Sequence, residues 1–388
     1  MKNVSFEEKL KKTNALRQRI TKGDSDTKLA LSISDLLVER AVKTVNNEIP
    51  EIVGWVLTCY KNPDEMLIQA YEILSELYCG RNPMKGKFAE LGMTTIDHAL
   101  LYCELDNKYH CIYIRGKAVT TWRESPMRDL GHAISDDLIN WEIKEPVVPC
   151  PEDGWDSYQI WAPHIILENG TYYMFYSGVN KAEAQAIGIA VSKDLYSWEK
   201  LTVDAPAIVP GEWGNWKDNG KYSCRDACVI KGYDGFFYCY YCAMANAEFL
   251  SINHDGNPVK SKYCVGVSKS ENLTDWEDAG FIELPGNDRT PPESPFMVLK
   301  DNKYYLFYTD YADGTCYAVS DNPLTGFIHP KNRQIIPLVS ASEVLEKDGR
   351  WYISVISHLD NQCHFLEIYE MSWPKNDEGF ILKPLANK

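Results

Sequence analysis

The stretch Trp161-Ala-Pro-His-Ile-Ile-Leu167, followed by Glu168-Asn-Gly170 and Tyr172-Tyr-Met-Phe-Tyr-Ser177, contains the pattern that decides the fold. It predicts a short apolar strand, a tight turn, and an aromatic strand whose side chains alternate between two faces. Gly188-Ile-Ala-Val-Ser192 predicts a third strand, and Lys193-Asp-Leu-Tyr-Ser-Trp198 predicts a turn into a fourth. Four antiparallel strands in this order form the repeating unit of a β-propeller.

The same pattern recurs in five copies from about residue 96 onward. Each copy has a turn signal between its first two strands, namely Asp106-Asn107, Asn169-Gly170, Asp234-Gly235, Asp301-Asn302 and Asp348-Gly349. Four copies also have a turn that ends in an aromatic residue, at Trp141, Trp198, Trp276 and Phe327. The sequence therefore predicts a mainly β fold, with a five-bladed β-propeller as the catalytic domain over residues 86–388.

Residues 1–85 have helical spacing instead. Phe6, Leu10, Leu16 and Ile20 recur among charged residues, as on one face of a helix. We expect a small N-terminal α-helical region without a catalytic constellation, serving packing or dimerisation, so that the protein could form a homodimer. Recruitment of another partner is the alternative for this region.

Composition excludes several classes of function. The chain has 388 residues and a net charge of −15, which argues against partners such as nucleic acid or an anionic membrane. Its N-terminus lacks the apolar core of a signal peptide, so we expect a cytoplasmic protein. The 12 cysteines are expected to be buried free thiols, as is usual for intracellular cysteines. Cys239 and Cys242 are three apart in a strand and point to opposite faces, so they cannot easily share a metal. No metal site is predicted from them.

Acidic residues stand at the starts of the first strands, where a propeller strand meets the central channel. Asp97, Asp226 and Glu293 are expected at corresponding places in three blades, and Glu343 is a fourth acid from the last blade. One such acid is usually a cap or a solvated turn residue. Three converging carboxylates, however, repel one another and would destabilise the fold, so their presence points to a function. Converging carboxylates suit glycoside hydrolysis, in which one acid protonates the leaving oxygen and another activates water or attacks the sugar.

Three short motifs carry a family resemblance. Trp161-Ala-Pro163, Arg225-Asp-Ala227 and Glu293-Ser-Pro295 make residues from about 90 to 385 similar to the five-bladed propeller glycosidases of glycoside hydrolase families 43 and 32. The resemblance implies that Asp97 is the base or nucleophile and that Glu293 is the general acid. It also implies that Asp226 stabilises the transition state and modulates the pKa of the acid.

The same resemblance suggests which residues contact the sugar. Trp161 offers an apolar ring face, and Arg225 offers a guanidinium fork that would also hold Asp226 ionised. The remaining candidates are Glu343 and three residues for which an ordinary structural role is an equal alternative, namely His98, His164 and Arg289.

These observations predict a glycoside hydrolase that acts on short glycans, with pentosides as the first expectation and inversion favoured over retention. The first blade lacks the Trp-Met-Asn-Asp-Pro-Asn-Gly motif of fructosidases, which disfavours a fructoside. The alternatives are a propeller glycoside phosphorylase, for which Arg225 and Arg289 are the basic candidates, and a non-catalytic sugar-binding or scaffold propeller. No cofactor is expected to be required, and a structural calcium ion in the channel is compatible with the sequence.

Overall fold

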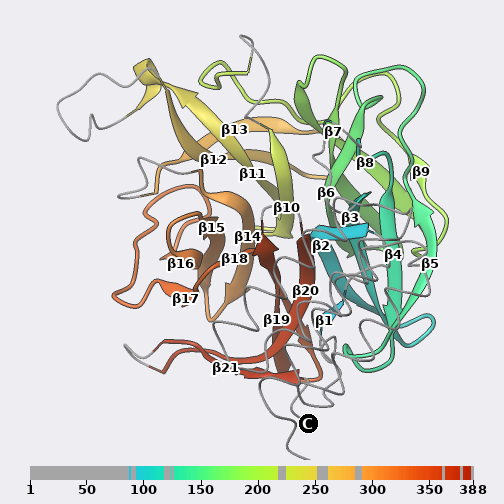
Figure 1. Cartoon of the computed structure of the whole chain (residues 1–388). Coiled ribbons are helices and arrows are strands. Elements are labelled where there is room, and N and C mark those ends of the chain that lie inside the picture. Colours follow the sequence, from blue (N-terminus) through green and yellow to red (C-terminus); the bar gives the residue numbers. More distant parts are fainter. Residues whose placement is uncertain are drawn as a thin grey trace, which may run out of the picture.

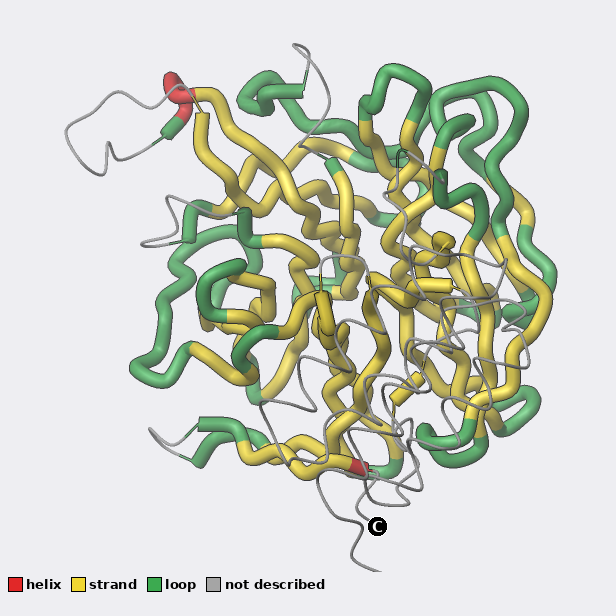
Figure 2. The backbone as a smooth tube through the Cα atoms, in the orientation of Figure 1, coloured by secondary structure: helices red, strands yellow, loops and turns green. Residues whose placement is uncertain are grey.

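The computed structural model describes residues 87–88, 93–117, 123, 126–216, 224–250, 261–284, 291–360, 363–375 and 379–385. In this part of the chain five antiparallel sheets stand around a central axis, which confirms the predicted five-bladed propeller (Figure 1). Strands and their connecting loops make up nearly all of it (Figure 2). The predicted helical region at 1–85 lies outside the described residues. No helix among the described residues is long and apolar enough to span a bilayer.

Each sheet is one blade, and in the first four blades the strands run outward from the axis in chain order. Blade 1 contains β2 (Met93–Cys103), β3 (Lys108–Lys117), β4 (Leu130–Ser135) and β5 (Trp141–Val147). Blade 2 contains β6 (Gln159–Glu168), β7 (Thr171–Val179), β8 (Gln185–Ser192) and β9 (Glu199–Lys200). Blade 3 contains β10 (Arg225–Lys231), β11 (Phe237–Asn246), β12 (Ser261–Ser270) and β13 (Glu277–Ile282), with the short 3-10 helix η1 (Ala247–Phe249) after β11. Blade 4 contains β14 (Glu293–Lys300), β15 (Lys303–Asp310), β16 (Gly314–Ser320) and β17 (Gln334–Ile336).

Blade 5 closes the ring with strands from both ends of the described chain. Its first three strands are β18 (Val339–Lys347), β19 (Arg350–Asp360) and β20 (Cys363–Ser372). The outer edge of β20 then pairs with β1 (Lys87–Phe88) from before blade 1 and with β21 (Ile381–Pro384). Because β1 is followed directly by blade 1, this pairing joins the first and last blades.

The hydrophobic core lies at the seams between neighbouring blades. At the seam of blades 2 and 3, Phe175 and Ile189 pack with Val229 and Tyr241. The other seams have similar clusters of aliphatic and aromatic side chains, and most of the large ones come from the second strand of each blade. The aromatic second strands that the sequence predicted therefore hold adjacent blades together.

In several blades a tyrosine of the second strand lies across from a glycine of the third strand. Tyr113 is paired with Gly131 in blade 1, and Tyr241 is paired with Gly266 in blade 3. A Cβ atom placed on either glycine would lie 2.3 Å from an atom of the tyrosine ring. These positions therefore require glycine because the ring occupies the space that a side chain would need.

The predicted aromatic turns are confirmed, and serine hydroxyls organise them. In blade 1 the Oγ of Ser135 accepts a hydrogen bond of 2.9 Å from the amide of Leu138, whose φ is 62°. Leu195 and Leu273 adopt the same left-handed conformation, with φ of 68° and 69°. The indole of Trp198 then donates to the carbonyl of Leu195 at 2.9 Å, which fixes the entry into the fourth strand.

Candidate active site

Every innermost strand is irregular close to the axis. In each blade the register between the first two strands shifts by a bulge, located at Thr95/His98, Trp161/His164, Arg225/Cys228, Glu293/Phe296 and Ser340/Glu343. Inside four of these bulges a residue other than glycine has a positive φ, namely Ala162, Asp226, Ser294 and Ala341. A bulge redirects side chains away from the regular alternation, and here it turns them toward the axis.

The three candidate catalytic acids occupy three different positions of this bulge. Glu293 is the last paired residue before it, Asp226 is its first residue, and Asp97 is its second. The expectation that the acids stand at corresponding positions was therefore wrong at the level of single residues. Glu343 is the first paired residue after the bulge of blade 5, which is the position that His98 occupies in blade 1. The bulges bring side chains from different positions of their strands close to the same point on the axis. The alternation of residues along a strand cannot reveal this.

One hydrogen-bonded network nevertheless brings the three acids together. The hydroxyl of Ser294 donates to Oδ2 of Asp97 at 2.8 Å, and the amide of Ser294 donates to Oδ2 of Asp226 at 3.3 Å. The guanidinium of Arg225 donates to Oε1 of Glu293 at 2.5 Å, and its Nε lies 3.4 Å from Oδ2 of Asp226. Blades 1, 3 and 4 thus each contribute one carboxyl group to a single cluster.

Residues of blade 2 hold the blade 3 part of this network. Oγ of Ser177 accepts a hydrogen bond of 2.9 Å from the amide of Asp226. Oε1 of Gln185 lies 3.4 Å from Nη1 of Arg225 and accepts from it. The side chain of Arg225 is almost completely buried, so its planar fork is fixed between Gln185, Asp226 and Glu293.

Burial and mutual repulsion change the proton affinity of the acids. Burial, followed by the charge of Glu293, raises the pKa of Asp97 to about 6. Burial also raises the pKa of Asp226, and although Arg225 opposes this effect, it does not outweigh burial and the charges of Asp97 and Glu293. Arg225 therefore lowers the pKa of Asp226, as expected, but its effect is too small to hold Asp226 ionised.

Tyr311 belongs to the cluster although the sequence did not single it out. Its hydroxyl donates to Oε2 of Glu293, so that Tyr311 and Arg225 each fix one oxygen of that carboxyl group. Tyr311 is 60% exposed and lies in the turn after β15. Burial of its hydroxyl and the charge of Glu293 raise its pKa, so the phenol remains a donor. No motif surrounds this residue, and only the fold places it beside Glu293.

His98, His164 and Glu343 lie near the axis but contact neighbouring blades. Nε2 of His98 is 2.7 Å from Oγ of Ser354 in blade 5, and burial lowers the pKa of His98 to about 3. Nε2 of His164 donates to the carbonyl of Val229 at 3.0 Å, while its Nδ1 is 3.8 Å from Oε1 of Glu343. Oε2 of Glu343 accepts from the amide of Leu100 at 2.7 Å. His164 and Glu343 thus connect inner strands, and His98 contacts the second strand of blade 5. These contacts support the structural alternative for His98 and His164, although His98 and Glu343 also line the pocket at the axis.

The pocket at the axis is open, and its space of about 280 Å³ includes bulk solvent. It is lined by residues from all five inner strands, among them Asp97, Asp226 and Ser294. Trp161 is not among its lining residues, and its half-buried ring packs beside Ile114 and Met127. Arg289 lies outside the described residues.

Comparison with known proteins agrees with this geometry. Residues 105–320 match the family described as glycosyl hydrolases family 43. The chain is 25% identical over 253 residues to a xylosidase/arabinosidase of Bacteroides ovatus, covering 58% of this chain and 74% of that protein. It is 32% identical over 250 residues to a cell-wall β-fructofuranosidase of Zea mays, covering 57% of this chain and 40% of that protein. It is also 23% identical over 239 residues to a 1,2-β-oligomannan phosphorylase of Thermoanaerobacter, covering 58% and 72%.

Solved structures share the fold. A thermostable family-43 glycoside hydrolase superposes with a TM-score of 0.56 at 21% identity, covering 75% of this chain and 93% of that one. A β-xylosidase/α-arabinofuranosidase from a compost metagenome, solved in a calcium-free form with xylotriose, superposes with a TM-score of 0.53 at 16% identity, covering 75% and 94%. These likenesses extend over the propeller.

Proposed function

Since the chain belongs to family 43 of the glycosyl hydrolases, we propose that it hydrolyses short pentosides, with Asp97, Asp226 and Glu293 as its catalytic carboxyl groups. One observation carries this proposal. Three carboxyl groups from three blades share a single network through Ser294 and Arg225 at the axis of the propeller. Asp97 and Asp226 line the pocket and have raised pKa values, and carboxyl groups perturbed in this way are typical of acid–base catalysis.

In the proposed reaction Glu293 is the general acid. Its side chain is 21% exposed, and Arg225 and Tyr311 each hold one of its two oxygens. It donates its proton to the glycosidic oxygen as the bond between that oxygen and the anomeric carbon breaks. The leaving group departs as an alcohol, and Glu293 remains as a carboxylate until solvent returns a proton.

Asp97 is the proposed base. It removes a proton from water while the water oxygen forms a bond to the anomeric carbon on the opposite face, so that the configuration inverts. The raised pKa of Asp97, about 6, makes this carboxylate a stronger base than an exposed one near neutral pH. Asp226 lies between the two, next to Arg225, where it would orient the sugar and adjust the proton affinity of both partners.

Two comparisons support a pentoside as the substrate. The Bacteroides ovatus relative is named as a xylosidase/arabinosidase, and a structural neighbour is named as a β-xylosidase/α-arabinofuranosidase. We therefore propose xylosides and arabinofuranosides as the first substrates to examine.

The test is hydrolysis of aryl xyloside, arabinofuranoside, galactoside and fructoside by the purified chain, with short xylo- and arabino-oligosaccharides in parallel. Glu293→Ala should lower kcat on the unactivated oligosaccharides by ~10²-fold or more, and by less on aryl substrates whose leaving group needs little acid help. Glu168→Ala is the control, because Glu168 forms an ion pair with Lys231 away from the pocket. Equal activity of Glu293→Ala and the wild type on oligosaccharides would contradict the role of Glu293.

A phosphorylase is the second candidate, favoured by the match to the oligomannan phosphorylase and by the Arg225 guanidinium beside Glu293. Against it, Arg225 is buried and already has Glu293 and Asp226 as ionic partners. The same assay with and without inorganic phosphate separates the two candidates. A sugar 1-phosphate product, formed only when phosphate is present, would identify the phosphorylase. No turnover on any substrate under either condition would favour a non-catalytic sugar-binding propeller.

The remaining expectations concern calcium, assembly and location. Near the axis, Nδ1 of His98 and Oγ of Ser342 have no hydrogen-bond partner among the described residues, and Glu343 supplies a carboxyl group. Calcium takes six to eight oxygen ligands, so water would have to supply most of them. We propose that any ion there is structural, and thermal unfolding with calcium or a chelator tests this. Homodimerisation through 1–85 and a cytoplasmic location stay predictions.

A further inference from the structure

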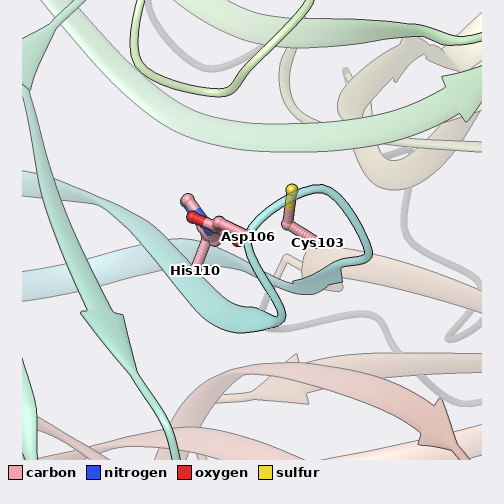
Figure 3. Close-up of side chains that lie close together, drawn as sticks. All are labelled: Cys103, Asp106 and His110. Atoms are coloured by element: carbon pink, nitrogen blue, oxygen red, sulfur yellow. The ribbon is translucent and has the colours of Figure 1, made fainter.

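A second cluster of chemically active side chains lies on blade 1, away from the axis. Cys103 ends β2, Asp106 lies in the turn that follows, and His110 lies in β3. One ligand atom from each, a sulfur, an oxygen and a nitrogen, lies within 4.8 Å of the others. Figure 3 shows the three side chains projecting from this one hairpin.

The donor set and its geometry suit a tetrahedral ion. Zinc binds cysteine sulfur at about 2.3 Å and histidine nitrogen or carboxylate oxygen at about 2.0 Å, so neighbouring ligand atoms stand roughly 3.3 to 3.5 Å apart. Nε2 of His110 and Oδ2 of Asp106 are already 3.1 Å apart. The sulfur of Cys103 lies within 4.8 Å of both atoms, so a change of its side-chain torsion can bring it to this spacing.

Each of the three groups is also oriented by a further residue. Nδ1 of His110 is 2.9 Å from Nε2 of His132, the hydroxyl of Tyr196 donates to Oδ2 of Asp106 at 2.8 Å, and the hydroxyl of Tyr172 donates to Sγ of Cys103 at 3.3 Å. Outer partners of this kind fix the tautomer and direction of metal ligands.

The histidine pair can adopt the arrangement that a metal requires. Without a metal, Nε2 of His110 donates to Asp106, so Nε2 of His132 donates to Nδ1 of His110. With a metal on Nε2 of His110, the hydrogen moves to Nδ1 and is donated to Nε2 of His132, whose own hydrogen moves to Nδ1. That Nδ1 atom is buried and has no hydrogen-bond partner among the described residues, so neither state breaks a bond there. The pair gains and loses no net proton.

We propose that Cys103, Asp106 and His110 bind one zinc ion, with water as the fourth ligand. On binding, the Cys103 thiol releases its proton to solvent and the thiolate sulfur coordinates the ion. Cys103 and His110 are buried, whereas the side chain of Asp106 is 30% exposed and leaves a route for the ion and for the water.

The proposed ion would brace the seam between blades 1 and 2. Its ligands belong to the β2–β3 hairpin, and the two tyrosines that contact them belong to blade 2. Asp97 lies six residues back along β2, about 20 Å away at the rise of a strand. The site is therefore separate from the pocket, and the proposal stands or fails independently of the glycosidase mechanism.

The first test measures metal binding to the full chain. Protein stripped with a chelator is given zinc chloride, dialysed and analysed for metal, and about one zinc per chain is expected. Cobalt chloride replaces zinc in a second sample, where a thiolate-to-cobalt charge-transfer band reports a cysteine ligand directly. This spectrum uses the wild type, so it does not depend on a variant that could fail to fold.

Variants then identify the ligands. Cys103→Ser and His110→Gln should abolish the cobalt band and lower bound zinc to below about one tenth per chain, and His132→Leu should weaken binding by ~10- to 100-fold. Cys111→Ser is the matched control, because Cys111 is equally buried but packs at the seam of blades 1 and 5. Absence of the band in the wild type, or zinc binding unchanged in folded Cys103→Ser, would overturn the proposal.

Discussion

Asp97 lies close to another carboxyl group, and under the proposed mechanism its ionisation is expected to limit activity at acid pH. Burial and Glu293 raise its pKa to about 6. A base must be ionised to accept a proton, so kcat/KM is expected to fall as the pH decreases through about 6. The measurement is the pH profile of kcat/KM for the best pentoside. A profile that stays flat down to pH about 4 would contradict the role of Asp97 as base.

Ser294 offers a way to move that profile. Its hydroxyl donates to Asp97, and this hydrogen bond favours the ionised carboxylate and so lowers the pKa of Asp97. Ser294→Ala is therefore expected to shift the acid limb of kcat/KM to higher pH. Ser157→Ala removes another buried hydroxyl, one bonded to the carbonyl of Gly154, and should leave the limb in place. A shift toward lower pH in Ser294→Ala would show that the hydrogen bond acts differently.

Tyr311 is expected to position Glu293. Tyr311→Phe removes the donor to Oε2 and lets the carboxyl group turn about its remaining contact with Arg225, which should lower kcat/KM by ~10-fold or more. Tyr233→Phe, at another exposed tyrosine, serves as the control. The loss should be larger for oligosaccharides than for aryl substrates, because only the former depend strongly on protonation. An equal loss on both would indicate a role in sugar binding.

The three acids could be picked out from the sequence because each stands at the start of an apolar strand, and Asp226 and Glu293 also lie in short motifs. Their exact partners could not. Ser294 lay inside a quoted motif without an assigned role, and Gln185 and Tyr311 reach the cluster from other blades or turns. Such contacts depend on where the blades meet, which no local pattern encodes. For His98 the sequence left substrate binding and a structural role equally open; its Nε2 contacts Ser354 across a seam, and the residue also lines the pocket.

The blade is the scale at which sequence patterns were most informative. Alternation, turn signals and the aromatic turns located the strands, because each of these is a property of a few consecutive residues. The bulges were not foreseen. At Ala162 and Ser294 a residue other than glycine has a positive φ, of 41° and 47°, so composition gave no sign of the irregular backbone.

Gly266 tests the packing within a blade. A methyl group at this position would lie 2.3 Å from the ring of Tyr241, which is completely buried, so Gly266→Ala should destabilise the protein by about 1–3 kcal/mol. Gly379→Ala is the control, because its nearest neighbour would be 3.9 Å away. The measurement is the free energy of unfolding in urea. Equal stability of the two variants would mean that the Tyr241 ring can move aside.

For the whole molecule, the number of blades followed from the number of repeats, but the way the ring closes did not. β1 is only Lys87–Phe88, too short for a recognisable strand pattern, and it pairs with β20 near the other end of the chain. Residues 1–85 lie outside the described residues, so the predicted helices there stay a prediction.

Phe88 tests the importance of this closure. It is 6% exposed, and its ring lies 5.4 Å from that of Tyr113 and 5.5 Å from that of Trp141, centroid to centroid. Phe88→Ala should lower the free energy of unfolding by about 3 kcal/mol or more, because it empties the seam between blades 5 and 1. Leu105→Ala, at a 70% exposed position, should change it little. A small effect of Phe88→Ala would mean that β21 alone suffices to close blade 5.

The pairing of β1 with β20 also has a consequence for synthesis on the ribosome. Lys87 and Phe88 leave the exit tunnel before any blade is complete, whereas their partners Glu367 and Leu366 are synthesised roughly 280 residues later. At 5–20 residues per second, the nascent chain carries an open ring for on the order of tens of seconds. During that interval the inner face of blade 1 and the aromatic side chains around Phe88 are exposed, so this is the stage at which a chaperone would be needed most.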